Sequence, residues 1–126
     1  MDYFEIKGKN KLHGEVEISG AKNAVLPLMA ASILNEKKLQ ILNVPYLSDS
    51  STMANILESM GAKVSFEENN KISIDPSSLK DPFASYDLVK TMRASFYVLG
   101  PLIAKFGYAK VSLPGGCAWG PRPVDF

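Results

Sequence analysis

In the stretch SGAKNAVLPLMAASIL, residues 19–34, the spacing of apolar residues changes from a strand-type to a helix-type period. Before it, apolar and polar residues alternate over residues 12–19, and a period of two is typical of a β-strand. Within it, apolar residues recur at three- and four-residue spacing, which predicts a helix over residues 23–34. Pro27 falls in the first turns of that helix, where a missing N–H costs least. The chain therefore mixes strands with helices.

Outward from this helix, the remaining segments alternate between predicted strands, helices and turns. Ser48, Asp49, Ser50 and Ser51 are N-cap candidates for a helix that ends at Met60, and Gly61 suits the position just after it. Gly100-Pro101 predicts a kink or break inside a later helix. The resulting order is that of an α/β or α+β layered architecture. We expect strands at Tyr3–Lys7, Leu12–Ser19, Lys38–Asn43 and Tyr108–Leu113, a hairpin of Ala62–Phe66 with Ile72–Ile74 across Asn69-Asn70, helices at Ser48–Met60 and Asp87–Phe106, and a loop at Pro76–Pro82.

The last predicted strand leads into LPGGCAWGPRPVDF, residues 113–126, which holds the single cysteine, Cys117. A glycine pair before it favours a loop over a regular element. Two prolines flank Arg122 and make it the middle of a stiff, extended segment. A thiol with a displayed guanidinium five residues on indicates a site for an anionic substrate. From residue type alone, Cys117 is more often an inert, small apolar residue.

Two further cations lie near predicted helix starts. Lys22 and Asn23 stand where a strand gives way to a helix, and the free N–H groups of a helix start attract anions. Ser-Gly-Ala-Lys lacks the spacing of a P-loop, and a solvated lysine is the ordinary alternative. Arg93 lies on a mostly apolar helix, where it must pair, bind an anion or extend to solvent. Residues 20–43 and 86–113 both run from a helix with a cation in its first turns to a strand, but this faint similarity does not establish a repeat.

Composition excludes several classes of protein. The chain has 126 residues, enough for one domain, and its net charge of +1 favours neither nucleic acid nor an anionic membrane surface. No apolar run is long enough to span a bilayer and the N-terminal stretch MDYFEIKGKN has no signal-peptide pattern, so we expect a cytoplasmic protein. One cysteine makes no internal disulfide and has no companions for a zinc site, so we expect no metal and no cofactor.

Three motifs together resemble one family: GAKNA at residues 20–24, DLVKTMRAS at residues 87–95 and LPGGCAWGPRPVD at residues 113–125. They are similar to the UDP-N-acetylglucosamine 1-carboxyvinyltransferase family of enolpyruvyl transferases. The resemblance implies part of an inside-out α/β barrel of two similar domains. It places residues 1–21 as strands of the second domain and residues 22–126 as the first part of the first domain. The family's proteins are much longer, so the stop inside a functional loop resembles a truncation.

The resemblance implies transfer of the enolpyruvyl group of phosphoenolpyruvate to the 3′-hydroxyl of UDP-N-acetylglucosamine, with release of phosphate. This is the first committed step of peptidoglycan synthesis, which links the family to cell wall biogenesis, cell shape, the cell cycle and cell division, and to fosfomycin as an inhibitor. It implies that Cys117 donates a proton to the methylene carbon and that Lys22 contacts phosphoenolpyruvate. The other substrate-binding residues it implies are Asn23, Arg93, Arg122, Pro123, Val124, Asp125 and Phe126. The general base and further arginines come from sequence beyond this chain.

Other interpretations stay open. A shikimate-branch enolpyruvyl transferase shares fold and reaction but has no cysteine at this place. A non-catalytic fragment would bind a UDP-sugar at most, and a redox role for Cys117 lacks a resolving thiol. An incomplete barrel would expose apolar helix faces such as Met53, Ile56 and Leu57, so we also expect self-association or a partner.

Overall fold

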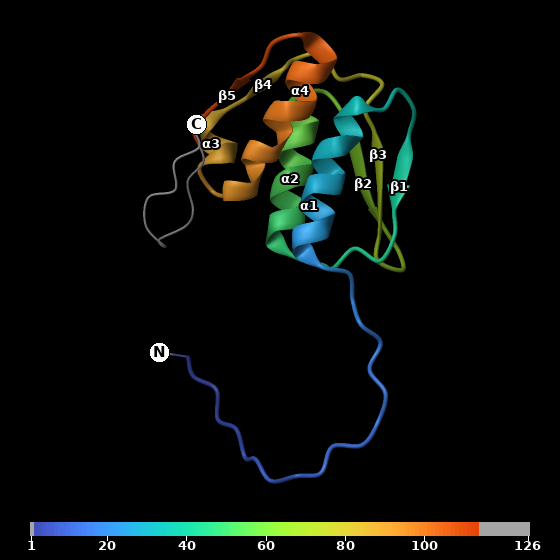
Figure 1. Cartoon of the computed structure of the whole chain (residues 1–126), viewed down its shortest axis with the longest axis vertical. Helices are drawn as coiled ribbons and strands as arrows, with labels where there is room; N and C mark the ends of the chain where they lie inside the picture. The colour runs from blue at the N-terminus through green and yellow to red at the C-terminus, as the bar shows by residue number, and fades with distance from the viewer. Residues whose placement is uncertain (1, 114–126) are drawn as a thin grey trace.

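A computed structural model of the chain describes residues 2–113, and regular secondary structure begins at Lys22 (Figure 1). Within residues 2–113, four α-helices, two 3-10 helices and five strands follow in mixed order, which confirms the predicted mixture of α and β structure. They are α1 (Lys22–Ala31), η1 (Ser32–Leu34), β1 (Leu39–Ile41), α2 (Ser48–Ser59), β2 (Lys63–Glu67), β3 (Lys71–Asp75), β4 (Phe83–Ala84), α3 (Tyr86–Val89), η2 (Arg93–Val98), α4 (Leu99–Phe106) and β5 (Lys110–Val111).

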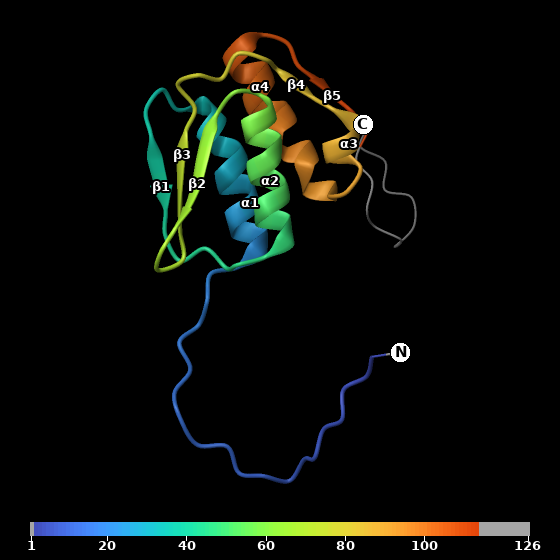
Figure 2. The same cartoon turned by 180° about the vertical axis from the view of Figure 1, so that it is seen from behind.

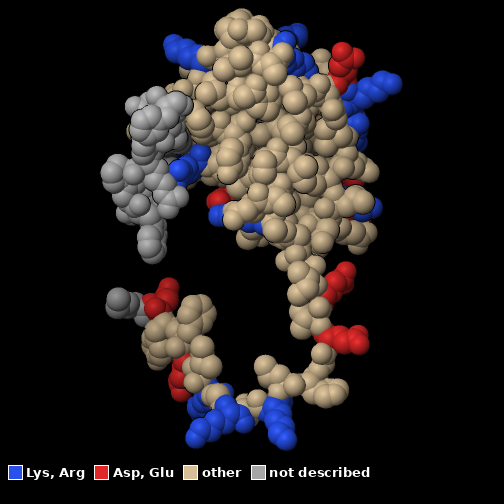
Figure 3. Space-filling model, in the orientation of Figure 1, with Lys and Arg blue, Asp and Glu red and all other residues tan. Residues whose placement is uncertain are grey.

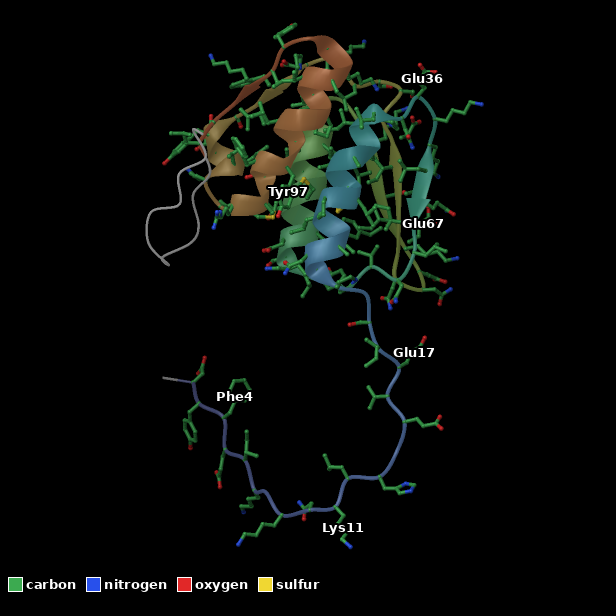
Figure 4. All side chains as sticks on the ribbon, in the orientation of Figure 1. Phe4, Lys11, Glu17, Glu36, Glu67 and Tyr97 are labelled. Carbon is green, nitrogen blue, oxygen red and sulfur yellow. The ribbon has the colours of Figure 1, made fainter. Side chains whose placement is uncertain are left out.

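Residues 2–20 form an extended arm that leaves the folded body, so the strands predicted at Tyr3–Lys7 and Leu12–Ser19 are wrong for this structure (Figures 1 and 4). Its apolar side chains are almost fully solvent-exposed, with Phe4 at 97%. Alternation alone does not make a strand, because each strand needs a neighbour for its N–H and C=O groups. Within the described chain, no segment lies alongside the arm to supply one (Figure 2).

The main sheet is antiparallel with strand order β1-β3-β2. The predicted hairpin is confirmed: β2 pairs with β3, with Glu67 opposite Lys71 at the turn. Asn69 and Asn70 in that turn both have positive φ, 58° and 56°, a conformation that asparagine tolerates better than most residues. On the sheet face away from the helices, Gln40 Nε2 and the Ser73 hydroxyl donate hydrogen bonds to Glu67.

Helices α1 and α2 lie side by side between this sheet and a second layer made of α3, η2 and α4 (Figures 1 and 2). The predicted helix at residues 23–34 is confirmed as α1 with η1, a 3-10 turn at its C-terminal end. Residue Gly61 follows α2 with φ of 103°, as expected of a residue that ends a helix. Because α1 and α2 lie between the sheet and the second layer of helices, they form the centre of the body.

The core fills the space between these layers and leaves α2 well covered. Met53, Ile56 and Leu57 are each fully buried, so the prediction that they are exposed is wrong. Helix α2 packs against α1, β2 and α3, and the sequence pattern could not place these neighbours. Half-exposed apolar side chains lie instead on α1, η1, η2 and α4. They are Leu28, Leu34, Tyr97 and Ile103, and Figure 4 labels Tyr97 on η2.

The predicted helix at Asp87–Phe106 is broken, but not at Gly100-Pro101 as expected. It splits at residues 90–92 into α3 and the continuous pair η2–α4. Met92 is extended, with φ of −145°, and the Thr91 and Ser95 hydroxyls donate to main-chain carbonyls nearby. Side-chain bonds of this kind compete with the helical ladder. Pro101 is tolerated because it lies in the first turn of α4, where the N–H that proline lacks would have no acceptor within α4.

Strands β4 and β5 pair in parallel, with Phe83 opposite Lys110 and Ala84 opposite Val111. The sequence pattern did not predict β4, since two residues show no period. A parallel pair needs a long crossover, and α3, η2 and α4 supply it. This β4–helix–β5 unit sets the direction in which η2 and α4 run.

Candidate functional site

The N-terminal ends of three neighbouring helical segments point the same way. Helices α1 and α2 both begin at the lower end of the body in Figure 1, and η2–α4 runs upward beside them; Figure 2 shows the same from behind. Each helix carries a partial positive charge at its N-terminus. Parallel packing therefore gathers positive helix ends on one side of the molecule.

Side chains do not cap these helix starts within residues 2–113. The N-cap residues are Ala21 for α1, Leu47 for α2 and Met92 for η2, and none makes a side-chain cap hydrogen bond. The serines and the aspartate at the start of α2 are cap candidates by residue type, but the cap is Leu47, the apolar residue before them. First-turn N–H groups are thereby left for water or for an anion.

Lys22 is the first residue of α1 and is partly exposed. Its Nζ lies 2.7 Å from Oδ2 of Asp49, which is in the first turn of α2; the side chains are 47% and 32% exposed. Asn23 follows on the exposed surface. The lysine is thus fixed by a partner 27 residues away in the sequence. Of the residues that sequence analysis treated only as helix caps, Asp49 is the one that joins the site.

The entry to α1 is held by a close backbone approach. The Gly20 N–H donates to Asn43 Oδ1 at 3.1 Å, and a Cβ on Gly20 would lie 1.9 Å from the main-chain oxygen of Asn43. Asn43 itself has φ of 54°. Glycine is therefore required two residues before Lys22, and the loop after β1 decides where α1 begins.

Arg93 is the first residue of η2 and is half-buried. Within the described residues it makes no ion pair, while η2 itself packs against α1. The neighbouring Lys90 is exposed at the surface and pairs with Asp87 at 2.7 Å, and this hydrogen bond raises the pKa of Lys90. Lys22 and Arg93 are thus the two predicted site cations that begin neighbouring helical segments.

The remaining predicted site residues lie outside the described residues: Cys117, Arg122, Pro123, Val124, Asp125 and Phe126. β5 ends at Val111, two residues before Leu113, the last residue that the structure describes. Figure 3 shows that the face over α1, α2 and α4 carries few charged side chains. Charged groups gather mainly at the edges of the body and on the arm.

Residues 2–113 contain no group of three or more metal-binding side chains and no helix long and apolar enough to cross a membrane. A small pocket of about 100 Å³ lies at the end of the sheet near the β2–β3 turn, and neither Lys22 nor Arg93 lines it. Its lining residues are Val44, Pro45, Tyr46, Phe66, Glu67, Asn70, Lys71 and Ile72.

Comparisons with known proteins agree on one family. Residues 6–126 match the family described as EPSP synthase (3-phosphoshikimate 1-carboxyvinyltransferase). The chain is 56% identical over 125 residues to a UDP-N-acetylglucosamine 1-carboxyvinyltransferase of Dichelobacter nodosus and 56% identical over 126 residues to one of Vibrio parahaemolyticus. Each match covers 99% of this chain and 30% of the relative, so the chain spans less than a third of their length.

A solved structure gives the same answer for the fold. The enolpyruvyl transferase NikO from Streptomyces tendae superposes with a TM-score of 0.70 at 26% identity, over 81% of this chain and 24% of that one. This similarity confirms that the chain has part of an enolpyruvyl transferase fold, the inside-out α/β type expected from the motifs.

Proposed function

The chain belongs to the EPSP synthase (3-phosphoshikimate 1-carboxyvinyltransferase) family, and from this premise we propose that it forms part of the active site of an enolpyruvyl transferase. The proposed reaction transfers the enolpyruvyl group of phosphoenolpyruvate to the 3′-hydroxyl of UDP-N-acetylglucosamine and releases phosphate. The sugar nucleotide is the acceptor that the names of the relatives indicate at 52–56% identity.

The observation that carries this proposal is the position of Lys22. It begins α1 beside the start of α2, next to first-turn N–H groups that no side chain caps in the described chain. Both proposed substrates are anions, and a cation with free amides at parallel helix ends suits an anion better than any neutral ligand. Lys22 accordingly contacts phosphoenolpyruvate, and Asn23 helps to hold the reacting sugar.

Arg93 acts on the UDP-sugar side of the site. Arg93 is a half-buried residue at the start of η2, with no ion pair among residues 2–113. A half-buried guanidinium without a carboxylate favours an anionic ligand, because its planar fork matches phosphate oxygens. A diphosphate group supplies such oxygens.

The chemical step falls to the C-terminal loop. The Cys117 thiol gives its proton to the methylene carbon of phosphoenolpyruvate, and the sugar hydroxyl attacks C2 as a base takes the hydroxyl proton. Loss of a proton from the new methyl group and departure of phosphate then complete the transfer. Arg122 binds the phosphate. The nucleotide pocket is lined by Pro123, Val124, Asp125 and Phe126.

The base and the other phosphate-binding arginines come from a longer protein, so residues 1–126 alone have negligible turnover. Because these residues are missing, the second candidate function is that of a non-catalytic fragment, which binds the UDP-sugar or a partner.

Half-exposed Leu28, Tyr97 and Ile103 favour self-association of the isolated chain. For the longer protein we propose a cytoplasmic role in peptidoglycan synthesis and cell wall biogenesis, through which it affects cell shape, the cell cycle and cell division.

The test joins this chain to the remaining sequence of the Dichelobacter nodosus relative, in place of that protein's matching first part. We expect phosphate release that depends on both substrates and that is lost in Cys117→Ser. Shikimate 3-phosphate serves as the competing acceptor, and turnover with it alone would transfer the assignment to the shikimate branch. A chimera that melts like the relative but releases no phosphate with either acceptor would overturn the proposal.

A second measurement uses the 126-residue chain itself. Its intact mass is recorded after exposure to fosfomycin, with and without UDP-N-acetylglucosamine. One adduct on Cys117 that forms faster with the sugar supports a nucleotide site and an anion site in this chain. Labelling by iodoacetamide but not by fosfomycin would instead favour the non-catalytic fragment.

A further inference from the structure

We propose that Asp49 is a positioning residue for Lys22, an inference that rests on the proposed function. Asp49 holds the Lys22 ammonium group at the anion subsite between the starts of α1 and α2. It thereby acts on phosphoenolpyruvate through Lys22 without contacting the substrate. Neither the family resemblance nor the sequence pattern assigned Asp49 a part in the reaction.

The geometry of the pair supports this role. Lys22 Nζ and Asp49 Oδ2 are 2.7 Å apart, which is the distance of a charge-assisted hydrogen bond. Among the ion pairs of residues 2–113, this is the one that joins two α-helices. Because α1 and α2 pack along their length, the two ends of the pair are mounted on rigid elements.

A stabilising role alone explains the pair poorly. Both side chains are substantially exposed, and exposed ion pairs contribute little to folding stability. A free lysine spreads over many rotamers, and holding it in one place costs conformational entropy when a ligand binds. The carboxylate of Asp49 removes that cost beforehand, so the ammonium group is already in position when the anion arrives.

A competing account predicts the opposite sign. If Asp49 only neutralises Lys22, its removal increases the local positive charge and should improve binding of phosphoenolpyruvate. If Asp49 positions Lys22, its removal lets the ammonium group move, and an error of about 1 Å in a reacting group costs about 100-fold in rate. The two accounts are therefore separable by kinetics.

The experiment uses the chimera described above and the variants Asp49→Asn and Asp49→Glu. For Asp49→Asn we expect kcat to fall about 10- to 100-fold, with the Tm close to that of the parent. Asp49→Glu keeps a carboxylate and should recover part of the loss. Unchanged or improved turnover in Asp49→Asn would overturn the inference while leaving the proposed function intact, since the parent chimera is active.

Asp87→Asn is the matched control. Asp87 also lies in the first turn of a helix and also pairs with a lysine at 2.7 Å. It lies on α3, however, and the proposed function gives neither Asp87 nor its lysine a substrate contact. Its replacement should change kcat by less than about twofold. An equal loss in both variants would show that any first-turn carboxylate has this effect and would refute positioning.

A double-mutant cycle tests whether Asp49 acts through Lys22. In a Lys22→Ala background, Asp49→Asn should change kcat by less than about twofold, because the residue it positions is gone. A full, additive loss would mean that Asp49 supports α2 or touches substrate itself, and it would reject the inference.

An activity-independent readout is the side-chain ammonium resonance of Lys22 in the 126-residue chain. We expect it to broaden or disappear by solvent exchange in Asp49→Asn but not in Asp87→Asn. Unchanged exchange in Asp49→Asn would remove the basis of the inference, whether or not the chimera folds.

Discussion

Replacing Gly20 with alanine would place a methyl carbon 1.9 Å from the backbone oxygen of Asn43. Carbon and oxygen atoms ordinarily approach no closer than about 3.3 Å. The backbone must therefore move by about 1.4 Å, given that contact limit. Such a shift breaks the hydrogen bond from the Gly20 N–H to Asn43 Oδ1, which is 3.1 Å long.

The expected cost follows from those two effects. A lost hydrogen bond and a strained backbone together cost about 1–3 kcal/mol. For a domain of this size, each kcal/mol lowers Tm by about 4 °C, so Gly20→Ala should lower Tm by about 4–12 °C. Because the Ala21 carbonyl accepts from both Ala24 and Val25, the first turn of α1 moves as a unit and carries Lys22 with it.

The assay is urea and thermal unfolding of the 126-residue chain, with Gly8→Ala as the control. Gly8 lies in the arm and has no atom within 4 Å of an added Cβ, so its replacement should change stability by less than about 0.5 kcal/mol. Equal stability of the Gly20→Ala and Gly8→Ala variants would refute the reasoning. It would mean that the arm swings away and relieves the contact without cost.

Three further predictions concern the body. Gly61→Ala puts a Cβ 2.7 Å from the Ser78 oxygen at φ of 103°, so urea unfolding should show a loss of about 1–3 kcal/mol; wild-type stability would contradict this. Leu57→Ala empties a fully buried site and should cost about 2–5 kcal/mol by the same assay; a loss below about 1 kcal/mol would show that the site refills. Hydrogen bonds from the Ser77 hydroxyl and N–H lower the pKa of Asp75 below its ordinary value of 3.8. The ionised Asp75 carboxylate therefore adds to folding stability at pH values above 3.8, and this stabilisation is lost as the pH falls through the lowered pKa. The Tm difference between wild type and Asp75→Asn should therefore shrink below about pH 4, and a constant difference would count against this.

Local sequence signals predicted the central elements well. The apolar spacing from Val25 to Ile33 gives α1 and η1, and Gly61 ends α2, because helices and their ends depend on neighbouring residues. The same signals failed where distant contacts decide. Apolar alternation in residues 12–19 makes no strand without a neighbour, and hydroxyl groups around Met92 break a helix that the spacing continues.

The candidate site was only half visible in the sequence. Lys22 and Arg93 were found because each is a cation near a predicted helix start. Asp49 was seen only as a cap candidate, because its partner lies 27 residues away and the parallel packing of α1 and α2 cannot be read from a local pattern. Ion pairs between elements become predictable only once the topology is known.

The extended arm has a consequence for handling the protein. Residues 2–19 take part in no regular structure, and exposed backbone of this kind is the preferred substrate of proteases. Lys7, Lys9 and Lys11 offer trypsin three adjacent cleavage points there. Brief digestion should therefore shorten the chain to a trimmed product whose core remains intact. That product would sediment as a more compact particle than its parent.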